Sequence, residues 1–317
     1  MYTSFTENHV FARNTFAGNS TLGDGGGLAV HAGVAILTGN VFDSNSAEVG
    51  GGFAAAAAAS ASFRGDRFVG NSAHSFGGGL ALEMGPVLSA TVIVSNTAER
   101  GGGIAFYEWS NPWNPSASLI NTVIAGNQAS LEGPGMFVPP GMTVYLLHTT
   151  LAGNTGGDGA AVTQSWYPSQ SPGASTVMLT NTIVASQSVG LRVTDASTAI
   201  VNGVLWNNTP QIVAQSPEAT VSIQNSHAGA PAFANPSAGD YHLSAGSAAR
   251  DAGIDNGVMQ DIDGQVRPMG LNWDLGADEY PAPALGVSKQ PSAPYVNRGA
   301  VMTYALAVTN IGAGPAP

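Results

Sequence analysis

The sequence predicts an all-β chain: a single-stranded parallel β-helix of about eight to nine coils, with further short strands after it. Three observations lead to this prediction. A motif recurs about every 26 residues, short β-rich runs replace helical periodicity, and the composition is apolar enough to fold. Apolar residues make up 44% of the chain, but charged residues only 9% against roughly 25% in soluble domains.

The recurring motif is an apolar residue three positions before an asparagine, as in NVFDSNSAEVGGG at residues 40–52. Subtracting the numbers of successive closing asparagines gives separations of 26, 26, 25, 31 and 27 residues. Such a period indicates a solenoid rather than a domain around one central core. The closing asparagines are Asn19, Asn45, Asn71, Asn96, Asn127 and Asn154.

Each repeat predicts one coil of short strands that pair in parallel with the next coil, about 4.8 Å away. Phe16, Phe42 and Phe68 are expected to stack inward as a column. The asparagines are expected at the bends, each bonding local backbone and the next asparagine. Glycine triplets let the backbone turn tightly. The alanine run at 54–59 fits a narrow interior, with an alanine-rich helix as the alternative.

The Phe-x-x-Asn and Gly-Gly-Gly-Leu/Ile elements over about residues 1–230 resemble the polymorphic outer-membrane-protein repeats of bacterial autotransporters and other right-handed parallel β-helix proteins. The resemblance implies the fold. It leaves the activity open, because this fold carries adhesins, stalks, lyases and glycosidases. We therefore assign residues 1–239 to the β-helix.

Residues 240–280 change character and resemble the closing segment of secreted bacterial β-helix proteins. The resemblance rests on Ser-x-x-x-Asp-x-Gly, Asp-x-Asp-Gly-x-x-Arg-Pro and Asp-x-Gly-Ala-x-Glu elements. We expect this segment to cap the exposed strand edges at the end of the solenoid. Its carboxylates are candidate Ca²⁺ ligands, or else the aspartates cap turns and Arg267 pairs with a carboxylate. They are Asp261, Asp263, Asp274, Asp278 and Glu279.

Residues 281–284, Pro-Ala-Pro-Ala, predict a stiff linker. Residues 285–317 resemble the start of an Ig-like β-sandwich repeat of large bacterial surface proteins. The alternation through Val301, Thr303 and Ala305 supports strands there. About a third of such a domain is present, so we expect it to be incomplete.

The charge and the composition of the chain exclude several classes of binding partner and cofactor. The net charge is −11 with a single lysine, Lys289, which argues against nucleic acid and anionic membrane surfaces. The absence of cysteine excludes disulfides and Cys-based metal sites. We expect no membrane insertion and no cofactor beyond Ca²⁺. The first residues lack signal-peptide character, and we interpret the chain as a monomeric piece of a longer extracellular or cell-surface protein.

One column of residues is a candidate catalytic site. Stacking predicts that Glu48, His74 and Glu99 lie on consecutive coils, three residues after their asparagines, with Arg100 beside them. The two carboxylates would then lie roughly 9–10 Å apart at the backbone, near the separation in inverting glycosidases. His74 would act as acid or base, and Arg100 is the candidate base of a lyase. A solvated polar turn is the alternative interpretation.

Aromatic side chains cluster in two insertions that follow the glycine-rich turn, FYEWSNPWNP at 106–115 and QSWYPSQSPG at 164–173. Insertions on one face of a solenoid often form its binding face. These rings are candidates for binding a polysaccharide, a cell-surface glycan or a protein partner. The alternative is that the loops pack on each other. The candidates are Tyr107, Trp109, Trp113, Trp166 and Tyr167.

These observations favour a secreted or surface-displayed bacterial protein that acts as an adhesive or structural stalk. A polysaccharide lyase or glycoside hydrolase of the same fold is the alternative, and a purely structural spacer is the third hypothesis. The nucleotide, zinc-protease and serine-hydrolase motifs do not occur in the sequence.

Overall fold

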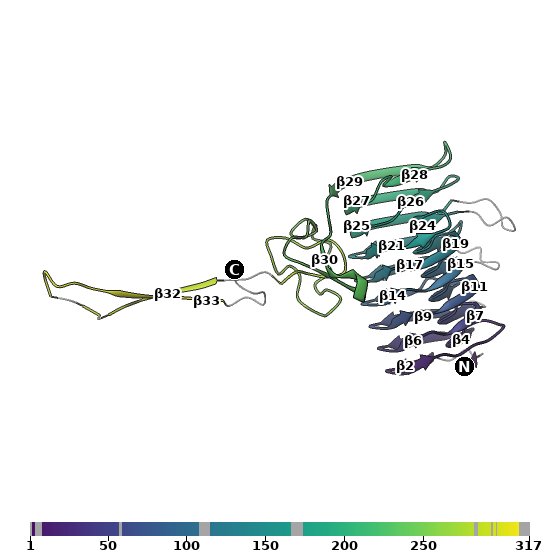
Figure 1. Ribbon diagram of the computed structural model, residues 1–317, viewed down its shortest axis with the longest axis horizontal. Coiled ribbons are helices and arrows are strands. Elements are labelled where there is room, and N and C mark those ends of the chain that lie inside the picture. Colours follow the sequence, from purple (N-terminus) through teal and green to yellow (C-terminus); the bar gives the residue numbers. More distant parts are fainter. Residues whose placement is uncertain are drawn as a thin grey trace.

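The computed structural model describes residues 2–3, 8–56, 59–107, 115–165, 174–281, 285–292, 294–295 and 297–310. In this part of the chain the regular structure is β-strand, apart from one 3-10 turn at Pro236–Ala238. Most strands belong to a stack of coils, and a looped segment lies against one flank of that stack (Figure 1). The fold is a parallel β-helix, as the repeat period predicts.

Each complete coil contributes one strand to sheet A, two to sheet B and one to sheet C, in that order. All strand pairs within these three sheets are parallel. Towards the end of the solenoid the two sheet B strands merge into one long strand, and sheet C ends at β23.

Sheet A contains β1 (Tyr2–Thr3), β4 (Leu28–His31), β8 (Phe53–Ala56), β12 (Leu80–Leu82), β16 (Ile104–Phe106), β20 (Met136–Val138), β24 (Ala160–Gln164), β26 (Val189–Val193) and β28 (Ile212–Ala214). The first half of sheet B contains β2 (Asn8–Ala12), β5 (Val34–Thr38), β9 (Ser60–Arg64), β13 (Val87–Ser89), β17 (Ser116–Ile120) and β21 (Thr143–Leu147). Its second half contains β3 (Thr15–Ala17), β6 (Val41–Asp43), β10 (Arg67–Val69), β14 (Val92–Val94), β18 (Val123–Ala125) and β22 (Thr150–Ala152). The long strands are β25 (Thr176–Ala185), β27 (Thr198–Asn207) and β29 (Thr220–Ala228). Sheet C contains β7 (Ser46–Val49), β11 (Ser72–Phe76), β15 (Thr97–Arg100), β19 (Gln128–Glu132) and β23 (Thr155–Gly156).

The core is a set of columns in which one side chain from each coil stacks on its equivalent in the next. Phe16 and Phe42 lie with ring centroids 4.7 Å apart and nearly parallel, and Phe42 and Phe68 follow at 4.6 Å. Register places them directly opposite one another on β3, β6 and β10. The alanine run continues this interior as strand β8, whose Ala54–Ala56 are buried, so the helical alternative does not hold there.

The asparagines at the bend between sheets B and C form a continuous ladder. In Asn71, Oδ1 accepts hydrogen bonds from both the backbone N and Nδ2 of Asn45, at 3.0 and 2.9 Å. Its own Nδ2 donates to Asn96 Oδ1 and to the carbonyl oxygen of Phe42. Both amide protons and the amide oxygen are therefore satisfied, which is what allows a polar side chain to be fully buried here.

The glycine triplets mark where the chain passes from sheet C into sheet A, and neighbouring coils approach too closely for a side chain. A Cβ added to Gly51 would lie 2.4 Å from the carbonyl oxygen of Ser72 and 2.5 Å from that of Gly78. Gly50, before it, has a positive φ of 67°. The triplet is thus required by backbone crowding and by conformation.

The segment after the solenoid does not cap the end of the stack, contrary to the expectation from sequence. It packs against the outer face of sheet B, where Leu243, Ala249 and Leu275 contact buried Ile183 and Leu205 (Figure 1). A second cluster joins Ala277 to the outward side chains of β14, β18 and β22. The physical reason is that these strands are apolar on both faces, which requires cover on both sides.

Two antiparallel pairs complete the described chain. β30 (Phe233–Asn235) pairs with β31 (Asp240–Leu243), and β32 (Leu285–Pro291) pairs with β33 (Tyr304–Asn310). The second pair extends away from the solenoid (Figure 1). Two strands do not form a sandwich, so what the structure has after residue 281 is a small antiparallel sheet. None of the described helices is long and apolar enough to cross a membrane.

Candidate functional site

Sheet C carries the residues that the sequence suggests for catalysis, and its outer face is polar. The outward positions are occupied by serine, threonine, glutamine and glutamate side chains, which are exposed or half-buried. Parallel pairing repeats these positions from coil to coil, so the polar side chains form rows across the sheet.

The predicted column of Glu48, His74 and Glu99 is displaced by one residue. Strand β11 has five residues where β7 and β15 have four, and its register shifts before Phe76. His74 takes the extra position. Ser75 comes level with Glu48 instead, and its hydroxyl donates to Glu48 Oε1 at 2.5 Å.

The sequence contained a signal for this bulge. Asn71 and Gly77 are separated by six positions, whereas Asn45 and Gly50 are separated by five. An extra residue between two fixed points of a coil must be accommodated locally, and a bulge does so with the least disturbance to the flanking columns.

Arg100 is engaged in a structural ion pair. Its Nε lies 3.1 Å from Glu132 Oε2, and its guanidinium carbon lies 5.9 Å from the centroid of the Phe76 ring. The hydroxyl of Ser165 donates to the other oxygen of Glu132. The arrangement holds neighbouring coils together, and in this geometry Arg100 is not positioned as the base of a lyase.

A shallow, open depression of about 510 Å³ crosses four coils on the outer face of sheet C. Serine and threonine residues line it together with His74 and Glu99. Thr97 Oγ1 donates to Ser72 Oγ at 3.2 Å, so part of the floor is a hydrogen-bonded hydroxyl row. The lining residues are Ser46, Ala47, Ser72, Ala73, His74, Thr97, Ala98, Glu99 and Ser130.

Of the five aromatic candidates, only Tyr107 lies within the part of the chain that the structure describes. It is 8% exposed, its hydroxyl donates to the carbonyl oxygen of Ala55 at 3.3 Å, and burial raises its pKa. Its ring stacks near Phe76, with centroids 6.3 Å apart. Tyr107 therefore packs against sheet A, and its ring is not available to a ligand in solvent.

The other four aromatic candidates, Trp109, Trp113, Trp166 and Tyr167, lie outside the described residues. The strands before them do have defined positions. β16 and β24 are separated in sheet A by β20 alone, with Ala105 opposite Phe137 and Phe137 opposite Thr163. Both aromatic segments therefore begin at the same edge of the solenoid.

The acidic residues of the segment after the solenoid act mainly as turn caps. Asp261 Oδ1 accepts the backbone N–H groups of Asp263 and Gln265, and Asp274 accepts those of Asp251 and Tyr280. Burial raises the pKa of Asp274 to about 7. Asp261 and Asp274 thus fit the alternative interpretation, in which aspartates cap turns.

Three side chains that sequence reasoning did not single out bind this segment to the solenoid. Asn121, His148 and Asn181 occupy the same bend of sheet B on consecutive coils, each with a positive φ. Asn121 donates to the carbonyl oxygen of Gln260 at 2.6 Å, and Asn181 both donates to and accepts from the backbone of Ile254. The signal was the first residue of the repeats NTVIAGN, HTTLAGN and NTIVASQ.

Comparison with known proteins adds little to this description. No family model matches the chain, and no curated protein matches it. Among solved structures, the crystal structure of the pectate lyase Pel9A aligns with 87% of this chain and 88% of its own, at 12% identity and a TM-score of 0.37.

Proposed function

We propose that this protein is a secreted or cell-surface bacterial β-helix that works as an adhesive or structural stalk and binds a polysaccharide or cell-surface glycan across sheet C. The observation that supports this most is the polar depression that spans Ser46, Ser72, Thr97 and Ser130 on four consecutive coils. Sheet B differs from sheet C, because its outer face is apolar and is covered by the segment that follows the solenoid.

The chemistry of the depression suits sugar hydroxyl groups. Serine and threonine hydroxyls both donate and accept hydrogen bonds, and His74 and Glu99 add a stronger donor or acceptor at the side. Strand pairing and the buried asparagines fix the backbone beneath the depression, so little backbone ordering is needed on binding. An elongated ligand would contact equivalent groups coil after coil.

Surface display is supported by the resemblance of the Phe-x-x-Asn repeats to polymorphic outer-membrane-protein repeats. The antiparallel strands β32 and β33 fit the start of an Ig-like repeat, in which they would form one edge. On this proposal, the Ig-like part extends the solenoid from the cell, and the aromatic segments after β16 and β24 add to the contact surface.

Hydrolysis is the second candidate, favoured by the presence of His74 and Glu99 in one depression. Two features count against it. Glu48, the second carboxylate, accepts a hydrogen bond from Ser75 and does not line the depression. Arg100, which a lyase would use, is paired with Glu132.

The test is affinity electrophoresis of the full chain through gels containing neutral and acidic polysaccharides, with Ca²⁺ present, together with mass spectrometry for released oligosaccharides. We expect retardation by at least one polysaccharide and no products. The double variant His74→Gln/Glu99→Gln should weaken binding about tenfold, the loss of one or two hydrogen bonds to charged groups. Glu218→Gln, an exposed glutamate away from sheet C, is the matched control and should bind like the native chain.

Three outcomes would change the proposal. Oligosaccharide products that disappear in Glu99→Gln would establish the hydrolase. Retardation that survives His74→Gln/Glu99→Gln but is lost when Trp109, Trp113 and Trp166 are changed to alanine would move the site to the aromatic segments. If no polysaccharide retards the protein, the glycan-binding proposal is wrong and the hypothesis of a purely structural spacer is favoured.

A further inference from the structure

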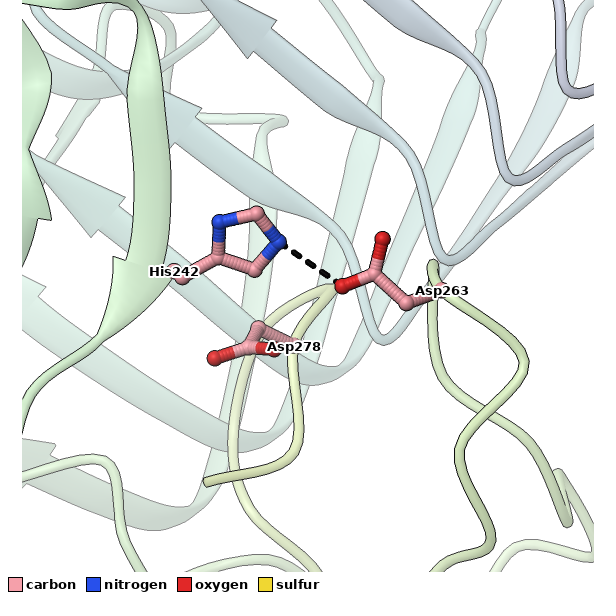
Figure 2. A group of neighbouring side chains, drawn as sticks. All are labelled: His242, Asp263 and Asp278. Carbon is pink, nitrogen blue, oxygen red and sulfur yellow. Dashed lines mark hydrogen bonds and ion pairs between the residues drawn. The ribbon is translucent and has the colours of Figure 1, made fainter. Parts of the chain in front are cut away.

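Three side chains from separate parts of the segment after the solenoid converge at one point, and Figure 2 shows them. His242 lies on β31, Asp263 in the turn that Asp261 caps, and Asp278 before the buried Glu279. One nitrogen or oxygen atom of each lies within 4.8 Å of the others. His242 Nε2 and Asp263 Oδ2 are 2.7 Å apart.

The cluster opens into a cavity of about 320 Å³ between this segment and the outer face of sheet B. Val92 and Val123 form part of the solenoid wall, and Arg67 is the cationic residue among those that line it. The side chains of His242 and Asp263 are 49% and 46% exposed, so an ion can reach them from solvent. Water molecules can complete its coordination from the same side.

Asp278 contributes a buried carboxylate to this group. It is 5% exposed, and its Oδ2 accepts the backbone N–H of Leu243 at 2.6 Å. Asp278 also lines the cavity. Burial raises the pKa of Asp278 to about 6. Burying a charged carboxylate is costly, and a cation at the cavity would offset that cost.

The imidazole is oriented by a fourth residue. His242 Nδ1 lies 2.5 Å from Asp240 Oδ1, which holds the ring and assigns the Nδ1 proton to that contact. Metal-bound histidines commonly have such a carboxylate on their other nitrogen, because it fixes the tautomer and raises the basicity of the ligating nitrogen. Nε2 is then the nitrogen directed at Asp263 and the cavity.

We propose that His242, Asp263 and Asp278 bind one divalent transition-metal ion of the Zn²⁺ class, with Asp240 as the positioning residue. One imidazole nitrogen and two carboxylate oxygens suit Zn²⁺, Co²⁺ or Mn²⁺, whereas Ca²⁺ takes an all-oxygen shell. This set differs from the aspartates suggested by sequence, because it includes a histidine and leaves out Asp261 and Asp274.

The three ligand atoms must move to surround an ion. Tetrahedral Zn²⁺ with bonds of about 2.0–2.1 Å places its ligand atoms about 3.4 Å apart. The contact between His242 Nε2 and Asp263 Oδ2, now 2.7 Å, must therefore open by about 0.7 Å, as the ion replaces the proton that now joins them, and separations that reach up to 4.8 Å must close. The ion would cross-link β31 to two turns far from it in sequence, and so tighten the segment on sheet B.

The test is isothermal titration calorimetry of ZnCl₂ into the full chain, without a histidine tag and stripped with EDTA, at pH 7.5. We expect one equivalent of Zn²⁺ to bind and Ca²⁺ to produce no heat at the same concentration. Co²⁺ should give the visible absorption of a nitrogen- and oxygen-ligated site. His242→Gln and Asp278→Asn should each weaken Zn²⁺ binding at least about tenfold.

Controls separate the site from general surface binding. His227→Gln removes a histidine from β29 and should bind Zn²⁺ like the native chain. Asp240→Asn should weaken binding about 10–100-fold and shift the Co²⁺ spectrum, as a positioning role requires. An unaltered far-UV circular dichroism spectrum establishes that each variant is folded. Absence of Zn²⁺ binding, equal binding by His242→Gln, or preference for Ca²⁺ would overturn the proposal.

Discussion

Arg267 and Glu279 form an ion pair that solvent does not reach, with Nη1 of the arginine 2.7 Å from Oε2 of the glutamate. Both side chains are 0% exposed. The arginine also donates to the carbonyl oxygens of Gly276 and Ala277, and it reaches Asn121 of the solenoid at 3.5 Å. The guanidinium group of Arg267 thus connects the turns of residues 240–280 to one another and to sheet B of the solenoid.

Breaking this pair should release the segment from sheet B. Arg267→Met leaves Glu279 buried without a counter-charge, which typically costs about 3–5 kcal/mol. We expect faster hydrogen exchange in residues 240–280, measured by mass spectrometry, while the amides of β4, β8 and β12 stay protected. Arg298→Met removes an exposed arginine near β33 and should change nothing. Equal protection of residues 240–280 in Arg267→Met and the native chain would contradict this anchoring role.

The asparagine ladder predicts a gradient of stability from its exposed end to its buried centre. Asn71→Ala should cost about 3 kcal/mol or more, because it removes hydrogen bonds to two coils and leaves their buried partners unsatisfied. Asn19→Ala, at the exposed start, should cost less than about 1 kcal/mol. The measurement is the midpoint of urea unfolding of each variant, monitored by circular dichroism. Similar midpoints for the two would show that burial does not set the value of a ladder position.

We expect the contact between residues 240–280 and the solenoid to weaken in acid, because His148 is buried in that contact. The side chain is fully buried, with Nε2 3.1 Å from Asn256 Oδ1 and 3.1 Å from Asn181 Nδ2. Burial lowers its pKa to about 3, and the charge of Arg267 acts in the same direction. Because the folded pKa is below the ordinary value of about 6.5, its contribution is complete above pH 6.5. That contribution is lost progressively as pH falls towards 3.

The acid effect of His148 is measured as a difference, since Asp274 and Asp278 titrate with the opposite sign. Their raised pKa values favour the folded state as pH falls from about 7 to 4. We therefore compare the native chain with His148→Gln in urea titrations from pH 8 to pH 4. The native chain should lose more stability than the variant, by roughly 1.4 kcal/mol for each pH unit below 6.5. Parallel pH profiles would mean that the folded and unfolded states protonate His148 alike, so that its side chain is not buried in solution.

Much of the solenoid could be predicted because a repeat turns sequence spacing into spatial proximity. Residues one period apart must stack when every coil has the same path, so Phe16, Phe42 and Asn71 could be assigned to columns from their spacing alone. Even the bulge at His74 had a signal in the extra residue before Gly77. The predicted catalytic column was wrong in register because that residue was not taken into account.

The segment after the solenoid has no such rule. His242 and Asp263 are 21 positions apart and meet only because β31 and the turn at Asp261 fold onto the same flank. That flank was visible in the sequence as strands apolar at every position, such as β18, but their partner was not. The coil, its columns and its ladder therefore follow from the periodicity of the sequence. The docking position of the non-repeating segment, and the side chains that it brings together, follow from three-dimensional packing, because no repeat relates the two surfaces in contact.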